Sequence, residues 1–138
     1  LHVILNGYQV AFMAPTEILA VQHFHYIKNL LESFNIKVSL LLGNQKNSEK
    51  ISIREDIKLG NINIVVGTHS LIQKEILFKN LALTIIDEQH KFGVHQRMHL
   101  FSKGKSNENI SASTYFNSNS NTENFGNDNV WSFRLFNN

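Results

Sequence analysis

The chain has 138 residues, 42% of them hydrophobic, with 13 lysine and arginine residues against 11 acidic ones and a formal charge of +2. This length and composition fit one modest globular domain, and the lack of cysteine excludes a disulfide framework and a thiolate metal site. No stretch of the sequence is apolar for long enough to span a membrane, and the first 20 residues lack the basic leader of a signal peptide. We therefore expect a cytoplasmic protein with no membrane partner.

The charge is distributed unevenly along the chain. Residues 1–106 carry 12 basic and 8 acidic side chains, which gives +4, and residues 107–138 carry 1 basic and 3 acidic side chains, which gives −2. A mildly basic body is compatible with nucleic-acid binding but does not by itself predict it.

The first predicted elements are a strand and a helix. Residues 9–14 form a short apolar run that ends at Pro15, which is typical of a strand. Thr16 then stands at the N-cap position of a helix that is expected to end near Ser33, and Glu17 places negative charge in its first turn.

The pattern of strand and helix repeats in the next segment. Residues 37–42 predict a second strand, and Ser48 is expected to cap a helix over residues 49–59. Gly60 is well placed to end that helix in the left-handed conformation. A third strand is expected over residues 62–66.

The remaining predicted elements complete an α/β pattern. A helical turn is expected at residues 71–74, a fourth strand at residues 81–87 and a last helix at residues 94–102. Strands that alternate with helices at this spacing predict a mostly parallel sheet flanked by helices, with right-handed connections. All strands then end at one edge of the sheet.

That edge collects polar segments, which are residues 14–17, 43–46, 67–69 and 87–90. Small residues, hydroxyls and backbone amides at helix starts suit a phosphate backbone or a nucleotide. Taken singly, each signal is weak: Thr16 is more often a plain helix cap, and His69, like His23 and His25, is more often an ordinary polar residue than a ligand.

Two adjacent carboxylates follow the fourth strand. Asp87 and Glu88 come directly after an apolar run, and neighbouring residues on a strand point to opposite faces, so the two acids suit different tasks. One carboxylate can hold a hydrated Mg²⁺, while the other accepts a proton from the water that attacks a phosphoryl group. The alternative is a strand end whose acids simply face water.

These segments together closely resemble the RecG family of superfamily 2 helicases. The matching residues are 13–20, 22–23, 67–73 and 85–97, and the resemblance covers roughly residues 3–105. RecG proteins are ATP-dependent DNA helicases and translocases that act on branched DNA in recombination and repair. The transcription-repair coupling translocases are the second family considered, because they share the elements at residues 14–16 and 67–69 but typically have Asp-Glu-Glu at position 87.

The resemblance implies a partial RecA-like P-loop NTPase fold over residues 1–105, with ATP and Mg²⁺ as the cofactors of the family. By this resemblance Asp87 holds Mg²⁺ through water and Glu88 activates the hydrolytic water, so both are catalytic. Gln89 and His90 couple the nucleotide site to DNA. The residues that correspond to DNA contacts with a fork or junction are Pro15, Thr16, Glu17, Gly43, Gly67, Thr68 and His69.

The chain also departs from the family pattern. No Gly-x-x-x-x-Gly-Lys-Ser/Thr motif occurs in the sequence, so the phosphate-loop strand is missing and no loop cradles the β- and γ-phosphates. The second motor domain and the DNA-binding wedge domain are also absent. The first residue is Leu, which suggests a start inside a larger gene product or an alternative start. We expect no tight binding of ATP or Mg²⁺ and no activity alone; the missing helicase segments are possible partners.

Residues 106–138 form an Asn/Ser-rich tail. Its composition predicts disorder. Out-of-frame translation fits the tail better, because codons for residues 121–131 shifted by one base can spell Ile-Pro-Arg-Thr-Leu-Ala-Met-Thr-Met-Tyr-Gly, which resembles RecG sequence; a genuine but diverged tail is the alternative.

Three functions remain open at this point: a RecG-type motor fragment, a non-catalytic nucleic-acid-binding module, and a non-functional gene remnant. The remnant hypothesis expects a hole in the middle of the sheet and an unpaired edge where the phosphate-loop strand is lost.

Overall fold

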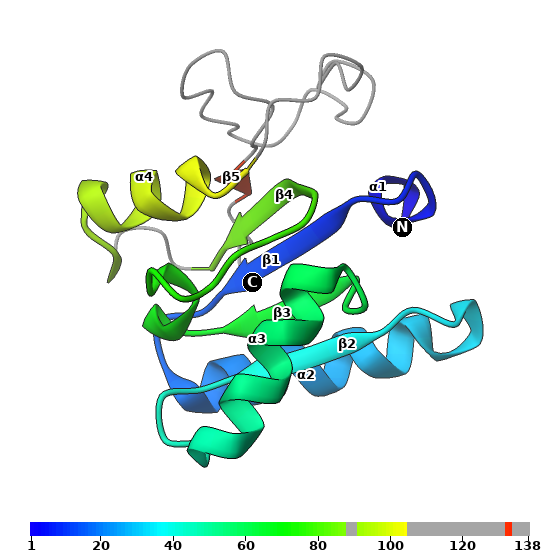
Figure 1. Cartoon of the computed structure of the whole chain (residues 1–138), viewed down its shortest axis with the longest axis horizontal. Coiled ribbons are helices and arrows are strands. Elements are labelled where there is room, and N and C mark those ends of the chain that lie inside the picture. The colour runs from blue at the N-terminus through cyan, green and yellow to red at the C-terminus, as the bar shows by residue number, and fades with distance from the viewer. Residues whose placement is uncertain (88–90, 105–131, 134–138) are drawn as a thin grey trace, which may run out of the picture.

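The computed structural model describes residues 1–87, 91–104 and 132–133. Within this part of the chain five strands form one parallel sheet in the order β2-β3-β1-β4-β5. The elements in chain order (Figure 1) are α1 His2–Leu5, β1 Gln9–Met13, α2 Glu17–Leu31, the 3-10 helix η1 Glu32–Phe34, β2 Val38–Leu41, α3 Asn47–Leu59, β3 Ile64–Gly67, the 3-10 helix η2 His69–Ile72, β4 Leu81–Ile86, α4 Val94–Ser102 and β5 Ser132–Phe133.

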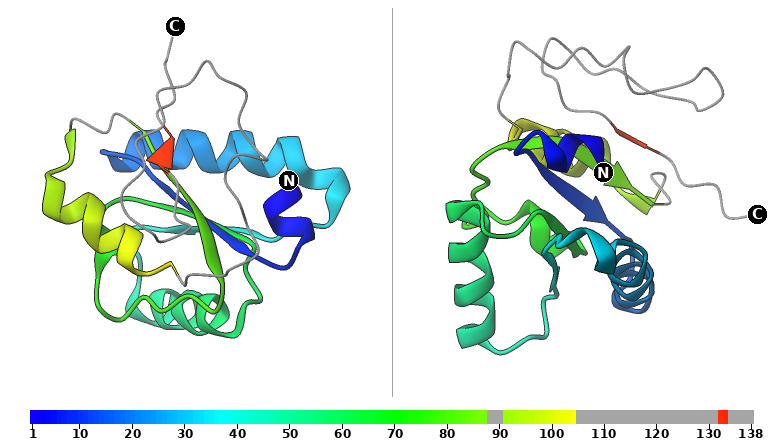
Figure 2. Two further views of the ribbon diagram at one scale, coloured as in Figure 1. Left: turned by 90° about the horizontal axis from the view of Figure 1, so that it is seen from above. Right: turned by 90° about the vertical axis from the view of Figure 1, so that its right-hand side faces the viewer.

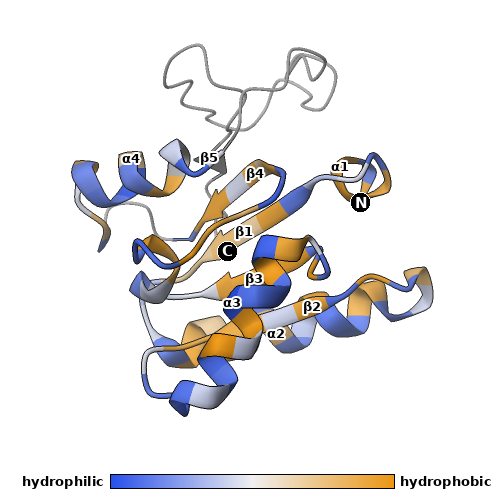
Figure 3. Ribbon diagram, in the orientation of Figure 1, coloured by the Kyte–Doolittle hydropathy of each residue, from blue (hydrophilic) through white to orange (hydrophobic). Residues whose placement is uncertain are grey.

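Strand β1 separates two hydrophobic cores. All five of its residues are buried, and alternate side chains point to opposite faces of the sheet. Val10 and Phe12 join the core beneath α2, whereas Ala11 and Met13 join the core beneath α3 and α4. Figure 2 shows α2 and α3 on opposite faces, and Figure 3 shows apolar residues concentrated along the strands. The predicted parallel sheet flanked by helices is therefore confirmed.

The ends of the helices are partly as predicted. Thr16 caps α2, since its Oγ1 accepts a hydrogen bond of 3.2 Å from the backbone N–H of Leu19. Gly60 ends α3 in the left-handed conformation at φ +78°. The prediction that Ser48 caps α3 is wrong: the helix begins at Asn47, and the N-cap residue Lys46 makes no side-chain capping bond.

Other boundaries also differ from the sequence prediction. The third strand begins at Ile64 rather than at residue 62, because the carbonyl of Ile62 accepts a hydrogen bond from the side chain of Gln9. The helical turn after this strand covers His69–Ile72 rather than residues 71–74. The short helix α1 was not predicted.

The sheet has no hole between its central strands. Phe12 of β1 pairs with Val66 of β3 on one side and with Ile85 of β4 on the other, so the strands are consecutive hydrogen-bonded neighbours. The expected hole in the middle is therefore wrong. The outer edge of β4 pairs with β5 over two residues, Thr84 with Ser132 and Ile85 with Phe133. Apart from β5, the predictions for residues 106–138 lie outside the described residues.

No helix in the described ranges combines the length and the apolar character needed to cross a membrane.

Lys103 fastens the end of α4 to the segment after η2. Its Nζ donates hydrogen bonds to the carbonyl oxygens of Gln73 at 2.7 Å and Ile76 at 2.8 Å. Burial lowers the pKa of Lys103 below its ordinary value of 10.5, although the nearby charge of Glu75 raises it. The folded protein therefore holds this proton less tightly than the unfolded chain does.

This lowered pKa predicts a pH-dependent stability. In the window just below pH 10.5 the unfolded chain binds more protons at Lys103, so the contribution of this residue to stability rises with pH. We expect the free energy of unfolding of the wild type, relative to that of Lys103→Met, to increase from pH 8 to pH 10 in urea titrations. Parallel pH curves for the two proteins would contradict this expectation.

Candidate functional site

The carboxyl ends of β1, β3 and β4 meet at one edge of the sheet. Met13 pairs with Gly67 of β3 and with Ile86 of β4. The backbone N–H of Ala14 donates to the carbonyl of Gly67, and that of Asp87 donates to the carbonyl of Met13, both at 2.9 Å. The shared edge predicted for these three segments is confirmed.

The start of α2 lies at this edge and is tied to the loop after β2. Thr16 is exposed, and Pro15 and Glu17 are half-buried. The carboxylate of Glu17 accepts a hydrogen bond of 2.9 Å from the side chain of Asn44. The loops after β1 and β2 are therefore joined beside the exposed N-terminus of a helix, where a negative group is electrostatically favoured.

The loop after β2 is also held by a lysine. Gly43 is exposed, and its carbonyl accepts a hydrogen bond of 2.8 Å from Nζ of Lys50 on α3. Gly43 has no positive φ, and a Cβ added there would meet nothing within 4 Å. The backbone of this loop is thus open to a ligand.

The predicted DNA-contact residues after β3 divide into two kinds. Gly67 and Thr68 are buried, and Ser70 beside them donates a hydrogen bond of 2.6 Å to the carbonyl of Leu41. His69 is exposed, and its ring centroid lies 5.1 Å from that of Phe92. Gly67 and Thr68 thus lie in the interior, while His69 is the residue of this segment that faces outward.

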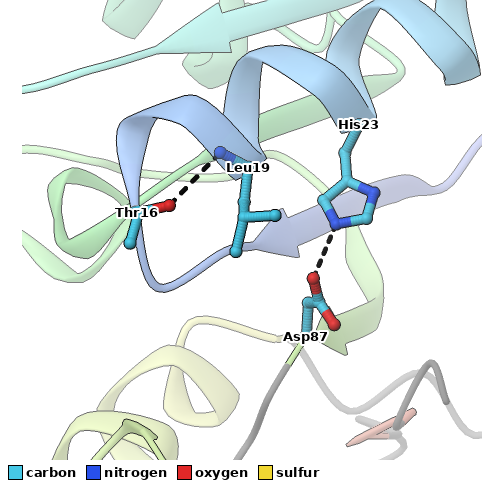
Figure 4. A network of polar contacts seen from close by, with 4 residues as sticks. All are labelled: Thr16, Leu19, His23 and Asp87. Atoms are coloured by element: carbon cyan, nitrogen blue, oxygen red, sulfur yellow. Dashed lines mark hydrogen bonds and ion pairs between the residues drawn. The ribbon is translucent and has the colours of Figure 1, made fainter. Parts of the chain in front are cut away.

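Asp87 is a fully buried carboxylate with one oxygen in use. Its Oδ2 lies 2.6 Å from Nε2 of His23 on α2, as Figure 4 shows. A carboxylate oxygen can only accept, so Nε2–H is the donor. The other oxygen, Oδ1, has no hydrogen-bond partner in the part of the chain that the structure describes. It is the free acceptor of the site.

The contact between His23 and Asp87 was not predicted, since His23 was interpreted as an ordinary polar residue. The sequence does carry one signal for this contact, which is the alternation of side chains along β4. Asp87 lies two residues after Ile85 and four after Leu83, so all three point to the same face of the sheet. Leu83 and Ile85 pack in the core beneath α2, and the side chain of Asp87 therefore points toward that helix. His23 lies seven residues after the cap Thr16, which is two helical turns.

The other proposed nucleotide-site residues, Glu88, Gln89 and His90, lie outside the described residues, and their roles stay predictions. Among the residues that the structure describes, no group of three or more His, Cys, Asp or Glu side chains could hold a metal ion. The free Oδ1 of Asp87 fits Mg²⁺ nevertheless, because this ion keeps several waters and is usually held by one or two carboxylates together with substrate phosphates.

Comparison with known proteins defines the class to which this fold and edge belong. The family described as DEAD/DEAH box helicase matches residues 1–119. The chain belongs to this family.

The similarity to RecG proteins is closer still. The chain is 51% identical over 105 residues to the ATP-dependent DNA helicase RecG of Aquifex aeolicus, which covers 76% of this chain and 13% of that protein. It is 52% identical over 99 residues to RecG of Thermotoga maritima, covering 72% of this chain and 13% of that protein. The solved structure of RecG bound to a three-way DNA junction matches at 50% identity and a TM-score of 0.58, over 63% of this chain and 12% of that one. The RecG resemblance is confirmed, and the chain spans about an eighth of the length of these relatives.

Proposed function

We propose that residues 1–105 are part of the first motor domain of a RecG-type, ATP-dependent DNA helicase, which works in the cytoplasm on forked or junction DNA. One observation supports this most strongly: the capped N-terminus of α2, the loop after β2 and the carboxylate of Asp87 share one edge of the sheet. A motor needs its nucleotide site and its DNA contact joined by rigid elements, and this edge joins them through α2 and β1.

The proposed roles follow from the chemistry of the side chains. Mg²⁺, when bound with ATP, neutralises charge on the phosphates. Asp87 would hold the hydrated metal ion through its free Oδ1, and Glu88 would serve as the base that accepts a proton from water. Gln89 and His90 link this site to DNA.

On the DNA side of the edge, Thr16 presents the N-terminus of α2 to a backbone phosphate. Pro15, Glu17, Gly43 and His69 lie around that helix start. Gly67 and Thr68 belong to the same proposed DNA-contacting segment as His69, although both are buried.

The chain alone is expected to lack helicase and ATPase activity, because its sequence holds no phosphate-loop motif. DNA-stimulated ATP hydrolysis by the purified chain would contradict this. The two alternative functions can be separated as well: salt-sensitive DNA binding without hydrolysis favours a binding module, and a melt without a cooperative transition favours a non-functional remnant.

The DNA contact is tested by adding a negative charge while keeping the helix cap. Aspartate caps a helix as well as threonine does, so Thr16→Asp should keep the melting temperature. It should nevertheless weaken binding to a forked oligonucleotide about fivefold, since two charges 4 Å apart in water interact by about 1 kcal/mol. Fluorescence anisotropy at several salt concentrations gives the Kd values.

The matched control is Ser33→Asp, which adds the same charge to the exposed 3-10 helix at the far end of α2. It should leave the Kd close to that of the wild type. Equal weakening by both variants would show an effect of net charge alone. No weakening by Thr16→Asp would place the DNA contact elsewhere.

A further inference from the structure

His23 binds a buried carboxylate whose second oxygen has no partner among the described residues. Its Nε2–H donates to Oδ2 of Asp87 at 2.6 Å, and the side chain of His23 is 17% exposed while that of Asp87 is fully buried. Oδ1 of Asp87 has no partner among the described residues. The hydrogen bond therefore fixes which oxygen of Asp87 is left to accept from a ligand.

The histidine is itself held from two sides. Its ring lies on Phe12, with centroids 4.6 Å apart and planes inclined by 38°. Phe12 belongs to the central strand β1, which pairs with β3 on one side and with β4 on the other. Asp87 is anchored to the same strand through its backbone bond to Met13. A packed ring and an anchored backbone leave this hydrogen bond little freedom.

We propose that His23 is a positioning residue for Asp87: through its hydrogen bond to Oδ2 it keeps Oδ1 directed to a divalent cation with its water shell. This inference rests on the proposed function, in which Asp87 holds Mg²⁺. Hydrogen-bonded partners of metal-binding carboxylates orient their ligands, and their loss typically costs 10–100-fold in metal affinity or activity.

The position of His23 on α2 links the proposed DNA contact to the carboxylate of Asp87. It lies seven residues from Thr16 on one continuous helix, about 10 Å along the axis at 1.5 Å per residue. The helix whose start is proposed to contact DNA thus also carries the group that orients Asp87. A shift of α2 along its axis would move the donor relative to Oδ2.

The test uses the full chain and Mn²⁺ alone as the probe, because paramagnetic broadening reports a weakly bound cation without any catalytic activity. In the ¹⁵N-labelled wild type, millimolar Mn²⁺ is expected to broaden the amide signals of Ala14 and Asp87, and Mg²⁺ should reverse the effect by competition. His23→Leu, which keeps bulk but has no donor, should raise the Mn²⁺ concentration for half-broadening about 10–100-fold. His23→Gln, whose Nε2–H can replace the imidazole donor, should recover most of the loss.

Two further variants make the result decisive. His25→Leu is the matched control, because His25 is exposed two residues along the same helix and its ring lies against Phe24, 5.3 Å between centroids, rather than against Asp87. It should behave as the wild type. If His23→Leu does not fold, His23→Asn takes its place, since its shorter side chain stays polar but cannot span the same distance.

The outcomes separate this inference from the proposed function. Broadening that Asp87→Asn abolishes but His23→Leu leaves unchanged would overturn the positioning role while keeping Asp87 as the metal carboxylate. Broadening that persists in Asp87→Asn, or no broadening near Asp87 in the wild type, would remove both the metal role of Asp87 and the role of His23.

Discussion

Replacing Gln9 by leucine is expected to lower the free energy of unfolding by about 3–5 kcal/mol, because the carbonyl of Ile62 and the N–H groups of Lys79 and Asn80 lose this partner, at about 1–3 kcal/mol each. The side chain of Gln9 is 4% exposed. Its Nε2 donates to the carbonyls of Ile57 and Ile62, both at 2.9 Å. Its Oε1 accepts from the N–H groups of Lys79 at 2.9 Å and Asn80 at 3.0 Å.

This one amide therefore joins the end of α3, the entry to β3 and the entry to β4. A loss of that size is a large fraction of the 5–15 kcal/mol that stabilises a typical domain. Urea unfolding followed by circular dichroism measures it. The control is Gln22→Leu at an exposed position of α2, which should change stability by less than about 0.5 kcal/mol. Equal effects of the two substitutions would show that the hydrogen bonds of Gln9 contribute little.

Replacing Gly67 by alanine is the second substitution with a large expected effect. A Cβ at this position would lie 2.6 Å from the carbonyl oxygen of Leu41 and 2.9 Å from Cγ of Leu71. The carbonyl belongs to the neighbouring strand β2 and cannot move without disturbing the pairing of Leu41 with Gly67. We expect a loss of about 3 kcal/mol in the free energy of unfolding, at the upper end of the usual cost of overpacking.

Gly43 provides the control for Gly67. It lies in the loop after the neighbouring strand β2, at the same edge of the sheet, yet an added Cβ there meets nothing within 4 Å. Gly43→Ala should therefore leave the unfolding midpoint nearly unchanged. If Gly67→Ala has the same urea midpoint of unfolding as the wild type, glycine at position 67 is needed for a reason other than packing. A change in DNA affinity without a change in stability would then favour a direct contact.

The parts of the fold that depend on local sequence could be predicted. The apolar runs that became β1, β2 and β4, the cap at Thr16 and the left-handed stop at Gly60 are each set by a few neighbouring residues. The shared edge followed from the alternation of strands and helices, because parallel strands must end together. At the start of α3, the neighbouring polar residues Asn47 and Ser48 both suit a helix N-terminus. The local sequence pattern was not enough to predict at which of them the helix begins.

The parts that depend on contacts between distant segments could not be predicted. Gln9 binds groups 48 to 71 residues away, and a glutamine in a strand gives no local sign of such partners. His23 meets Asp87 across 64 residues, which requires the rotation of α2 about its own axis to be known. The burial of Gly67 and Thr68 likewise depends on β2 and η2.

The proposed function requires DNA to bind at the edge of the sheet where the strands end. A forked oligonucleotide titrated into the ¹⁵N-labelled chain tests this through chemical-shift changes. We predict that the largest changes fall at Thr16, Gly43 and His69. Changes concentrated at Gly60 and Asn80, at the opposite end of the sheet, would contradict it.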